Sequence, residues 1–378
     1  MIPQRARRRG LAVATTLTGL MVVMVARNPL PRSRQQALAS EPAGLSSRDV
    51  AVVINSADPL SEQIGRTYQS LRGIPPEQLV RIRFPPGQGS LSPAAFRQLR
   101  GQILRQTPGH VQIYALAWAA PWRVGCQSIT SALTLGLDPA WCARGCRLTR
   151  QSPYYARGDV RRPYDSLGLR PSMLLAARDG REARRLIARG VAADGTAPPG
   201  SAYLMSTSDP SRNSRATGFA DVARMIGPSL TVRVLRADRL EGADDVIALF
   251  TGLARVEGLT SNRFRPGAVA DHLTSFGGEL TAGPTQGNQM SALRWLEAGA
   301  TGSYGTVVEP CNFPTKFPNP LLVLTYYRRG DSLVEAYWRS VAMPGQVVFI
   351  GEPLARPWGR VSRANPGGGS GARPRHAQ

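Results

Sequence analysis

Three residues of types that perform nucleophilic catalysis occur near the ends of two predicted strands. His272 lies at the end of the run 268–273, and Glu309 and Cys311 follow the run 302–308. A thiol nucleophile, an imidazole base and a carboxylate that orients the imidazole together make a nucleophilic catalyst. One predicted helix, 289–298, joins the two strands, so we expect the strand ends to be neighbours. The sequence therefore predicts a candidate catalytic site of His272, Cys311 and Glu309.

A polar loop that contains glycines follows the first of these strands and is the candidate binding segment. It comprises Thr274, Ser275, Gly277 and Gly278, and Asp271 comes just before it. Glycine lets a backbone turn tightly or approach a ligand closely. We expect Asp271 to cap the following turn rather than to act as an acid. Ser275 lacks the G-x-S-x-G surroundings of a serine nucleophile.

Each catalytic candidate also has a structural explanation. A histidine at a strand end can simply bond backbone carbonyls, and a solitary cysteine is often a small buried hydrophobe. Glu309 can pair with Lys316 or with a nearby arginine. The sequence leaves both explanations open.

Motifs for cofactors and metals are absent from the sequence. It has no phosphate loop, no G-x-G-x-x-G after a strand and no H-E-x-x-H. Cys142 and Cys146 are four residues apart, but no histidine or further cysteine pair lies near enough to complete a zinc site. We therefore expect neither a cofactor nor a metal.

The first 46 residues predict an export signal or an N-terminal anchor with a linker. Four arginines within positions 5–9 precede the uncharged run 11–26, which is the pattern of an export signal. That run is shorter than the roughly 20 residues of a full membrane span. A small-residue site at 37–39 follows prolines and arginines, so cleavage and anchoring both stay open. We expect an exported chain that is periplasmic, extracellular or anchored by its N-terminus.

Cysteine spacing agrees with export. Cys126, Cys142 and Cys146 form a cluster, whereas Cys311 stands apart. In an oxidising compartment, one disulfide within the cluster would hold a loop in place. The sequence does not say which two cysteines of the cluster pair.

The strong positive charge does not predict nucleic-acid binding. The net charge of +22 comes almost wholly from arginine, since Lys316 is the only lysine. Outside the N-terminal cluster the arginines are scattered, without the basic stripe or reader motif of a nucleic-acid-binding protein. We expect an envelope or extracellular ligand, with a peptide among the candidates, and membrane contact only through the N-terminal segment.

Apolar runs of strand length alternate with segments of helical periodicity, which is the rhythm of an α/β protein with a parallel sheet. The predicted strands are 49–55, 79–84, 111–118, 173–176, 202–206, 230–235, 246–250, 268–273, 302–308 and 347–350, and the predicted helices are 60–71, 94–106, 182–189, 289–298, 320–328 and 332–341. The expected fold is a three-layer sandwich of two side-by-side subdomains of caspase-like or flavodoxin-like type.

The same patterns divide the chain into five segments. After residues 1–46 come a first α/β subdomain at 47–122, a cysteine-containing insertion at 123–170, and a second α/β subdomain at 171–358 that carries the candidate site. The Gly-, Pro- and Arg-rich tail 359–378 is expected to be disordered.

Several motifs resemble an uncharacterised family of exported bacterial proteins. The segments are Val52–Asn55 through Arg72–Pro75, Asp271–Gly278 and Gly299–Cys311, and the resemblance extends from about 47 to 357. The layout in turn resembles gingipain-type cysteine peptidases of the caspase-like fold. Gly299-Ala300, Ser332–Ala336 and Gly351–Pro353 look like the closing elements of that fold.

The chain departs from those peptidases where their catalytic dyad stands. The resemblance implies a histidine between glycines after one strand and a cysteine after the next. Here Leu253 occupies the first position, and Thr274-Ser275 the second. One hypothesis is therefore a binding or scaffolding protein of the envelope that lacks the dyad. The alternative is a cysteine hydrolase with a displaced site made of His272 and Cys311.

Overall fold

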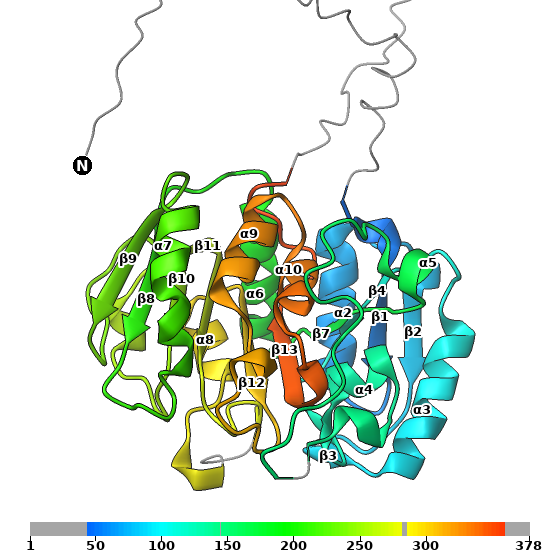
Figure 1. Ribbon diagram of the computed structural model, residues 1–378. Coiled ribbons are helices and arrows are strands. Elements are labelled where there is room, and N and C mark those ends of the chain that lie inside the picture. Colours follow the sequence, from blue (N-terminus) through cyan, green and yellow to red (C-terminus); the bar gives the residue numbers. More distant parts are fainter. Residues whose placement is uncertain (1–43, 144, 282–285, 360–378) are drawn as a thin grey trace, which may run out of the picture. The chain divides into compact units, whose positions relative to one another are not determined.

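The apolar runs of the sequence become the strands of a ten-stranded sheet (Figure 1). The computed structural model describes residues 44–143, 145–281 and 286–359. Residues 1–43 of the predicted N-terminal segment and nearly all of the tail lie outside these residues. Across the sheet the strand order is β2-β1-β4-β7-β13-β12-β11-β10-β8-β9.

The strands of the main sheet follow the predicted runs closely. Their bounds are β1 (Val50–Asn55), β2 (Leu79–Ile82), β4 (Ile113–Leu116), β7 (Ser172–Leu174), β8 (Ser201–Ser206), β9 (Thr231–Arg236), β10 (Val246–Thr251), β11 (Phe264–His272), β12 (Gly302–Thr306) and β13 (Val347–Gly351). Every residue of β1, β10 and β12 is buried, as expected for strands covered on both faces.

The sheet is mixed but mostly parallel. β13 pairs antiparallel with β12, and the other recorded pairings in this sheet are parallel. Apolar composition alone does not encode strand direction, which depends on the connection, so the sequence did not reveal this reversal. The described chain is a three-layer α/β sandwich, which confirms the predicted fold class.

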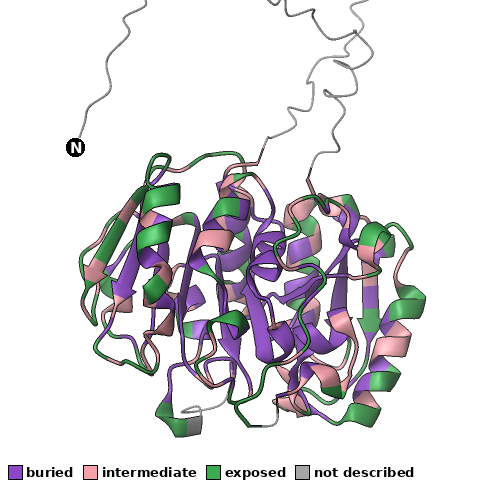
Figure 2. Ribbon diagram, in the orientation of Figure 1, coloured by how far each residue is buried: buried purple, intermediate pink, exposed green. Residues whose placement is uncertain are grey.

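Helices cover both faces of the sheet. Their bounds are α2 (Pro59–Arg72), α3 (Pro93–Gln106), α4 (Ile129–Leu135), α5 (Pro163–Leu167), α6 (Gly180–Ala193), α7 (Phe219–Ile226), α8 (Leu293–Ala298), α9 (Pro320–Arg328) and α10 (Leu333–Ser340). Successive side chains of β1 lie on opposite faces of the sheet. Val52 packs in one core with α2, and Val53 packs in another with α3. Figure 2 shows the buried strands between these partly exposed helices.

Two groups of strands repeat one topology. In the first group, β2 pairs on one side of β1, and the chain then crosses to form β4 on the other side of β1. In the second, it goes from β8 to β9 and then to β10 in the same way. Such reversals of strand order are topological switch points, where open α/β sheets bind ligands beyond the carboxyl ends of the strands.

Four helical segments differ from the prediction. α4, α5 and α7 were not predicted: α4 lies in the insertion and is buried all round, so it shows no amphipathic period, and α5 and α7 have only five and eight residues. α8 is shorter than predicted, because Met290 and Ala292 donate their N–H groups to the Ala254 and Gly277 carbonyls instead of starting a helix.

The insertion 123–170 is part of the fold. It supplies β5 (Arg123–Val124) and β6 (Gln127–Ser128), which form a small second sheet with β3 (Ser90–Leu91). The strands of the two predicted subdomains lie in one continuous sheet. The boundaries between the predicted segments therefore remain predictions. No helix within the described residues is long and apolar enough to cross a membrane.

Candidate functional site

His272 is a structural residue whose two ring nitrogens are both occupied. It ends β11 and is almost fully buried. Nδ1 accepts the indole N–H of Trp295 at 2.9 Å, so Nε2 carries the proton and donates to the Met290 carbonyl at 3.0 Å. Burial lowers the pKa of His272 to about 4. With no free lone pair, this imidazole cannot act as a general base, and that part of the catalytic hypothesis is wrong.

Cys311 has no thiol, because it forms a disulfide with Cys146. The thiolate is the nucleophile in cysteine catalysis, so the predicted role of Cys311 is also wrong. The carboxylate of Glu309 accepts the backbone N–H of Cys311 at 2.7 Å and is exposed. Glu309 thus holds its own turn and does not orient His272.

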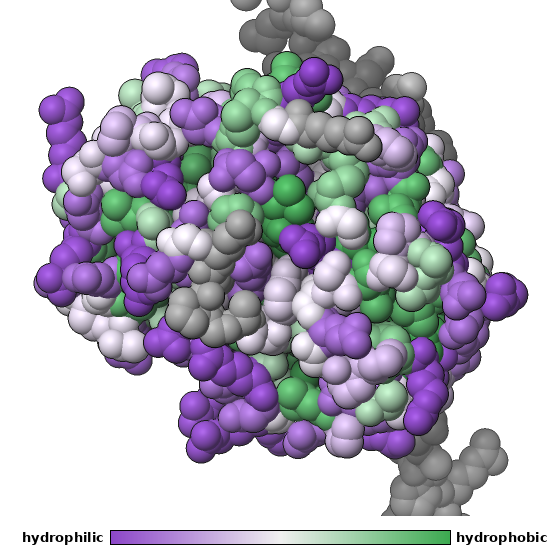
Figure 3. All heavy atoms as spheres, turned by 90° about the horizontal axis from the view of Figure 1, so that it is seen from below, coloured by the Kyte–Doolittle hydropathy of each residue, from purple (hydrophilic) through white to green (hydrophobic). Residues whose placement is uncertain are grey.

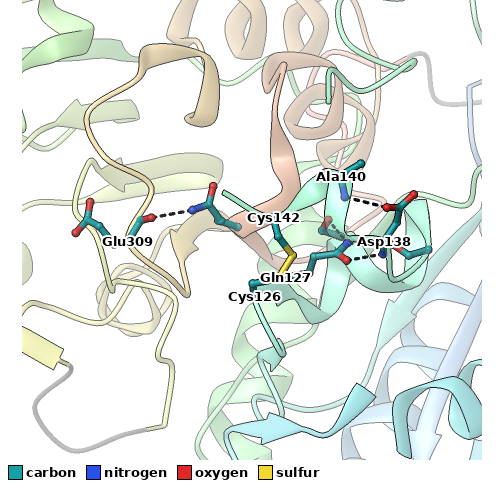
Figure 4. The surroundings of a disulfide bond; sticks show 9 residues. Cys126, Gln127, Asp138, Ala140, Cys142 and Glu309 are labelled. Carbon is teal, nitrogen blue, oxygen red and sulfur yellow. Dashed lines mark hydrogen bonds between the residues drawn. A yellow bond between two sulfur atoms is a disulfide. The ribbon is translucent and has the colours of Figure 1, made fainter. Parts of the chain in front are cut away.

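The second disulfide joins Cys126 to Cys142 and confirms that a pair forms within the cluster. Figure 4 shows how polar side chains organise this loop. Oε1 of Gln127 accepts the Asp138 N–H at 2.9 Å, and Asp138 in turn accepts the Ala140 N–H at 2.8 Å. Cys311, which stands apart in the sequence, bonds Cys146 and so links the insertion to the loop after β12.

Asp271 lies in the core rather than in a site. Its Oδ1 accepts from Nη2 of Arg215 at 2.7 Å, and both side chains are buried. Burial raises the pKa of Asp271 to about 6, although the Arg215 charge opposes this. Asp271 therefore does not cap the turn that follows, as we expected, but forms a buried ion pair.

The loop after β11 is held by its own polar contacts. The Thr274 hydroxyl donates to Oε1 of Gln289 at 2.6 Å and accepts from Nε of Arg212 at 3.1 Å. The Thr306 hydroxyl bonds the Thr274 and Ser275 carbonyls. These contacts fix the loop against β12.

Gly278 and Gly305 allow the loop after β11 to approach the backbone of β12. A side chain on Gly305 would lie 2.3 Å from atoms of both Gly277 and Gly278. Gly278 also donates its N–H to the Thr306 carbonyl at 2.9 Å. The close approach that we expected for a ligand is made by β12 instead.

A cavity of about 400 Å³ gathers part of the predicted set. Thr274, Ser275, Glu309 and the Cys311 disulfide line it, together with Arg212 from the loop after β8. It lies between the loops that follow β8, β11 and β12. His272 and Asp271 are not among its lining residues.

A larger crevice of about 740 Å³ lies at the first switch point, between β1 and β4. Its lining residues come from the segments that follow β1, β2, β4, β7 and β11. They are Asp58, Leu60, Pro86, Gly87, Trp118, Ala119, Ala120, Ala177, Arg178, Leu280 and Thr281. Figure 3 views the molecule from the end where β3 lies in Figure 1, and there apolar residues alternate with hydrophilic ones.

The crevice contains a carboxylate, a guanidinium and an aromatic ring. Asp58 caps α2 by accepting the Leu60 N–H at 2.9 Å. Trp118 packs edge-on against Phe84, with ring centroids 5.3 Å apart. Arg178 is half-exposed and binds Glu297 through Nε at 2.6 Å. Such a site can bind a ligand that has both apolar surface and opposite charges.

Asp58, Trp118 and Arg178 were missed as site residues by the sequence analysis. The rule that ligands collect at the carboxyl ends of strands applies equally to β1, β4 and β7. We applied it only to the strands near the single catalytic-type histidine, so the first switch point was overlooked.

Among the described residues, no group of three or more His, Cys, Asp or Glu side chains is placed to hold a metal ion. Comparisons with protein-family models, with curated proteins and with solved structures found no match. The two resemblances drawn from short motifs therefore stay predictions.

Proposed function

We propose that this chain is an exported envelope protein that binds a ligand without catalysing its reaction. The observation that carries the proposal is the crevice between β1 and β4, which has a carboxylate, a guanidinium and an indole but no nucleophile paired with a base. The proposed ligand is a short peptide or similar zwitterion, whose cationic group meets Asp58 and whose anionic group meets Arg178.

The charge pattern of the crevice supports this ligand class. Asp58 uses Oδ1 to cap α2, and its second oxygen is the acceptor proposed for an ammonium group. The ion pair with Glu297 involves Nε of Arg178, so the two Nη groups are the donors proposed for a carboxylate. Trp118 and Ala119 supply the apolar wall.

A relation to caspase-like proteins is part of the proposal. The order β2-β1-β4-β7 is repeated by β9-β8-β10-β11. A 2-1-3-4 order is that of flavodoxin-like sheets, and it supports two subdomains joined side by side. In the second one, the buried His272 and the disulfide at Cys311 support a protein that lacks peptidase chemistry.

Export is supported by the cysteines. Both disulfides, Cys126–Cys142 and Cys146–Cys311, are typical of an oxidising compartment. Together with the basic and apolar N-terminal residues, they favour export. Fusing residues 1–46 to a reporter enzyme that is active only after export tests this part; an inactive reporter would contradict it.

Ligand binding is tested with tetra-alanine in two forms. One form has free termini, and the other is acetylated and amidated so that it carries neither charge. We expect only the free form to raise the melting temperature of the full chain and to give saturation-transfer NMR signals. Equal binding of both forms, or binding of neither at millimolar concentration, would contradict the proposed ligand class.

Two substitutions locate the binding in the crevice. Asp58→Asn removes the charge and keeps a side chain that caps helices well, so α2 should be preserved. Arg178→Gln removes the guanidinium. Each should weaken binding of the free peptide at least tenfold. Arg181→Gln, on the same segment but outside the crevice lining, is the matched control and should bind as the wild type does.

A further inference from the structure

The two edges of the main sheet differ in how their backbone is protected. β2 is one edge and β9 is the other. At β2, the side chain of Gln106 covers the edge: its Oε1 accepts the Arg81 N–H at 3.2 Å, and its Nε2 donates to the Arg81 carbonyl at 3.0 Å. An exposed strand edge can pair with another chain, and this amide blocks such pairing.

No comparable cover is recorded for β9 among the described residues. β9 pairs with β8 only, and most of its residues are exposed (Figure 2). The Ala237 N–H donates to the Ser206 carbonyl, which sets the alternation of the strand. The N–H and C=O groups of Val232, Val234 and Arg236 therefore point away from β8.

Apart from Thr231, the side chains of β9 are apolar or cationic. Val234 is 45% exposed, although valine is usually buried. Arg236 lies on the same face as Val234 and has no recorded ion pair within the described part of the chain, and β9 contains no acidic residue. Arg233 lies on the other face, where its Nε donates to the Ser201 hydroxyl at 3.4 Å and its guanidinium lies over the Tyr203 ring. The edge thus offers unpaired backbone groups together with an exposed apolar side chain and a positive charge on one face.

We propose that β9 is a docking edge for an extended segment of another protein, one that carries acidic residues in alternation with apolar ones. The segment would add to the sheet as an eleventh strand through the outward groups of Val232, Val234 and Arg236. Alternation places its carboxylates on one face of the added strand, where they would pair with Arg236. A second copy of this chain is a poorer occupant, because each copy carries a net charge of +22.

The test uses the full-length chain and a fluorescently labelled hexapeptide of alternating valine and glutamate, with blocked termini. Fluorescence anisotropy should show binding that weakens as salt rises. A peptide with lysine in place of glutamate should not bind. A peptide that is N-methylated at alternate residues, and so cannot complete the backbone ladder, should bind at least tenfold more weakly.

Two pairs of variants separate backbone from charge. Val234→Pro removes the outward N–H, which an edge strand tolerates, and should weaken binding at least tenfold; Val234→Thr keeps the N–H and should bind normally. Circular dichroism and melting temperature establish that both fold. Arg236→Gln should weaken binding severalfold and flatten its salt dependence, whereas the control Arg224→Gln, on exposed α7, should not.

Three outcomes would overturn the proposal. Equal binding of the lysine peptide would exclude the charge match, and equal binding of the N-methylated peptide would exclude strand addition. A dimer that sedimentation detects without peptide, and that Val234→Pro dissociates, would make a second copy the occupant. None of these outcomes depends on the crevice at Asp58 and Arg178.

Discussion

The indole N–H of Trp295 donates to Nδ1 of His272 at 2.9 Å, and this bond determines how the imidazole responds to acid. Protonation of Nδ1 would break it, and burial disfavours the charged ring. Burial lowers the pKa of His272 to about 4, against about 6.5 in an unfolded chain. As pH falls, the unfolded state takes up this proton first.

Acid should therefore destabilise the fold through His272. Its contribution is fully present above about pH 6.5 and is lost as pH falls to about 4, by about 3 kcal/mol in total. In His272→Gln, the free energy of unfolding should change less between pH 7 and 4.5 than in the wild type. Urea titrations at both values measure this. His110→Gln, at an exposed position, is the control and should leave the pH dependence unchanged.

Cys311 should be inert to alkylation until the protein is reduced. The structure contains no free thiol among its described cysteines. Denatured, unreduced protein treated with iodoacetamide should gain no label. Mass spectrometry of a digest should find the linked peptides of Cys126–Cys142 and Cys146–Cys311. Labelling of Cys311 in the unreduced protein would restore it as a candidate nucleophile.

The two disulfides should contribute unequally to stability. Cys146 and Cys311 are 165 residues apart, and Cys126 and Cys142 only 16. Loop entropy in the unfolded chain predicts about 5 kcal/mol for the longer loop and about 3 kcal/mol for the shorter one. Cys146→Ala/Cys311→Ala should thus unfold at lower urea than Cys126→Ala/Cys142→Ala. The reverse order would show that native contacts in the insertion outweigh the entropy term.

Much of the fold was predictable because periodicity is a local property. The runs that became β1, α2 and α3 carry their own start and stop signals, such as Asp58 at the N-terminus of α2 and Gly73, with φ of 61°, at its end. The direction of β13 and the buried α4 depend on partners distant in sequence. No local pattern encodes them.

The candidate site was predicted only in part, for a chemical reason. Sequence position placed Thr274, Ser275, Glu309 and Cys311 together, and they do line one cavity. Residue type then suggested catalysis, but type does not reveal the bonding state. Whether a cysteine is oxidised, or an imidazole already bonded on both sides, depends on residues such as Cys146 and Trp295.

The buried pair of Asp271 and Arg215 should behave as a unit. Asp271→Asn leaves the arginine charge buried without its partner and should cost about 3 kcal/mol at pH 7. Arg215→Met should cost a similar amount, while the double variant should cost less than the sum. A double-mutant cycle from urea unfolding measures this coupling. Strict additivity would contradict it, and the exposed pair Asp221 and Arg224 should show almost none.

The raised pKa of Asp271 should change stability with pH in the direction opposite to that of His272. Its pKa in the folded state, about 6, lies above the ordinary aspartate value of 3.8. The stability that it contributes is therefore present below about pH 4 and is lost as pH rises through 6. Asp271→Asn should remove this term, so the variant should lose more stability than the wild type between pH 7 and 4.5. A smaller loss would indicate that Asp271 stays ionised in the core.

The contact between β12 and the loop after β11 should not tolerate a methyl group. In Gly305→Ala, the added carbon would lie 2.3 Å from backbone atoms of Gly277 and Gly278, so one strand or the loop must move. We expect a loss of about 3 kcal/mol in the free energy of unfolding. Gly109→Ala meets no atom within 4 Å and should change stability by less than about 0.5 kcal/mol. Because Gly305 is not among the residues that line the crevice at Asp58, the folded fraction of Gly305→Ala should still bind tetra-alanine. A loss of binding at temperatures where the variant is folded would mean that the β12 contact also shapes that crevice.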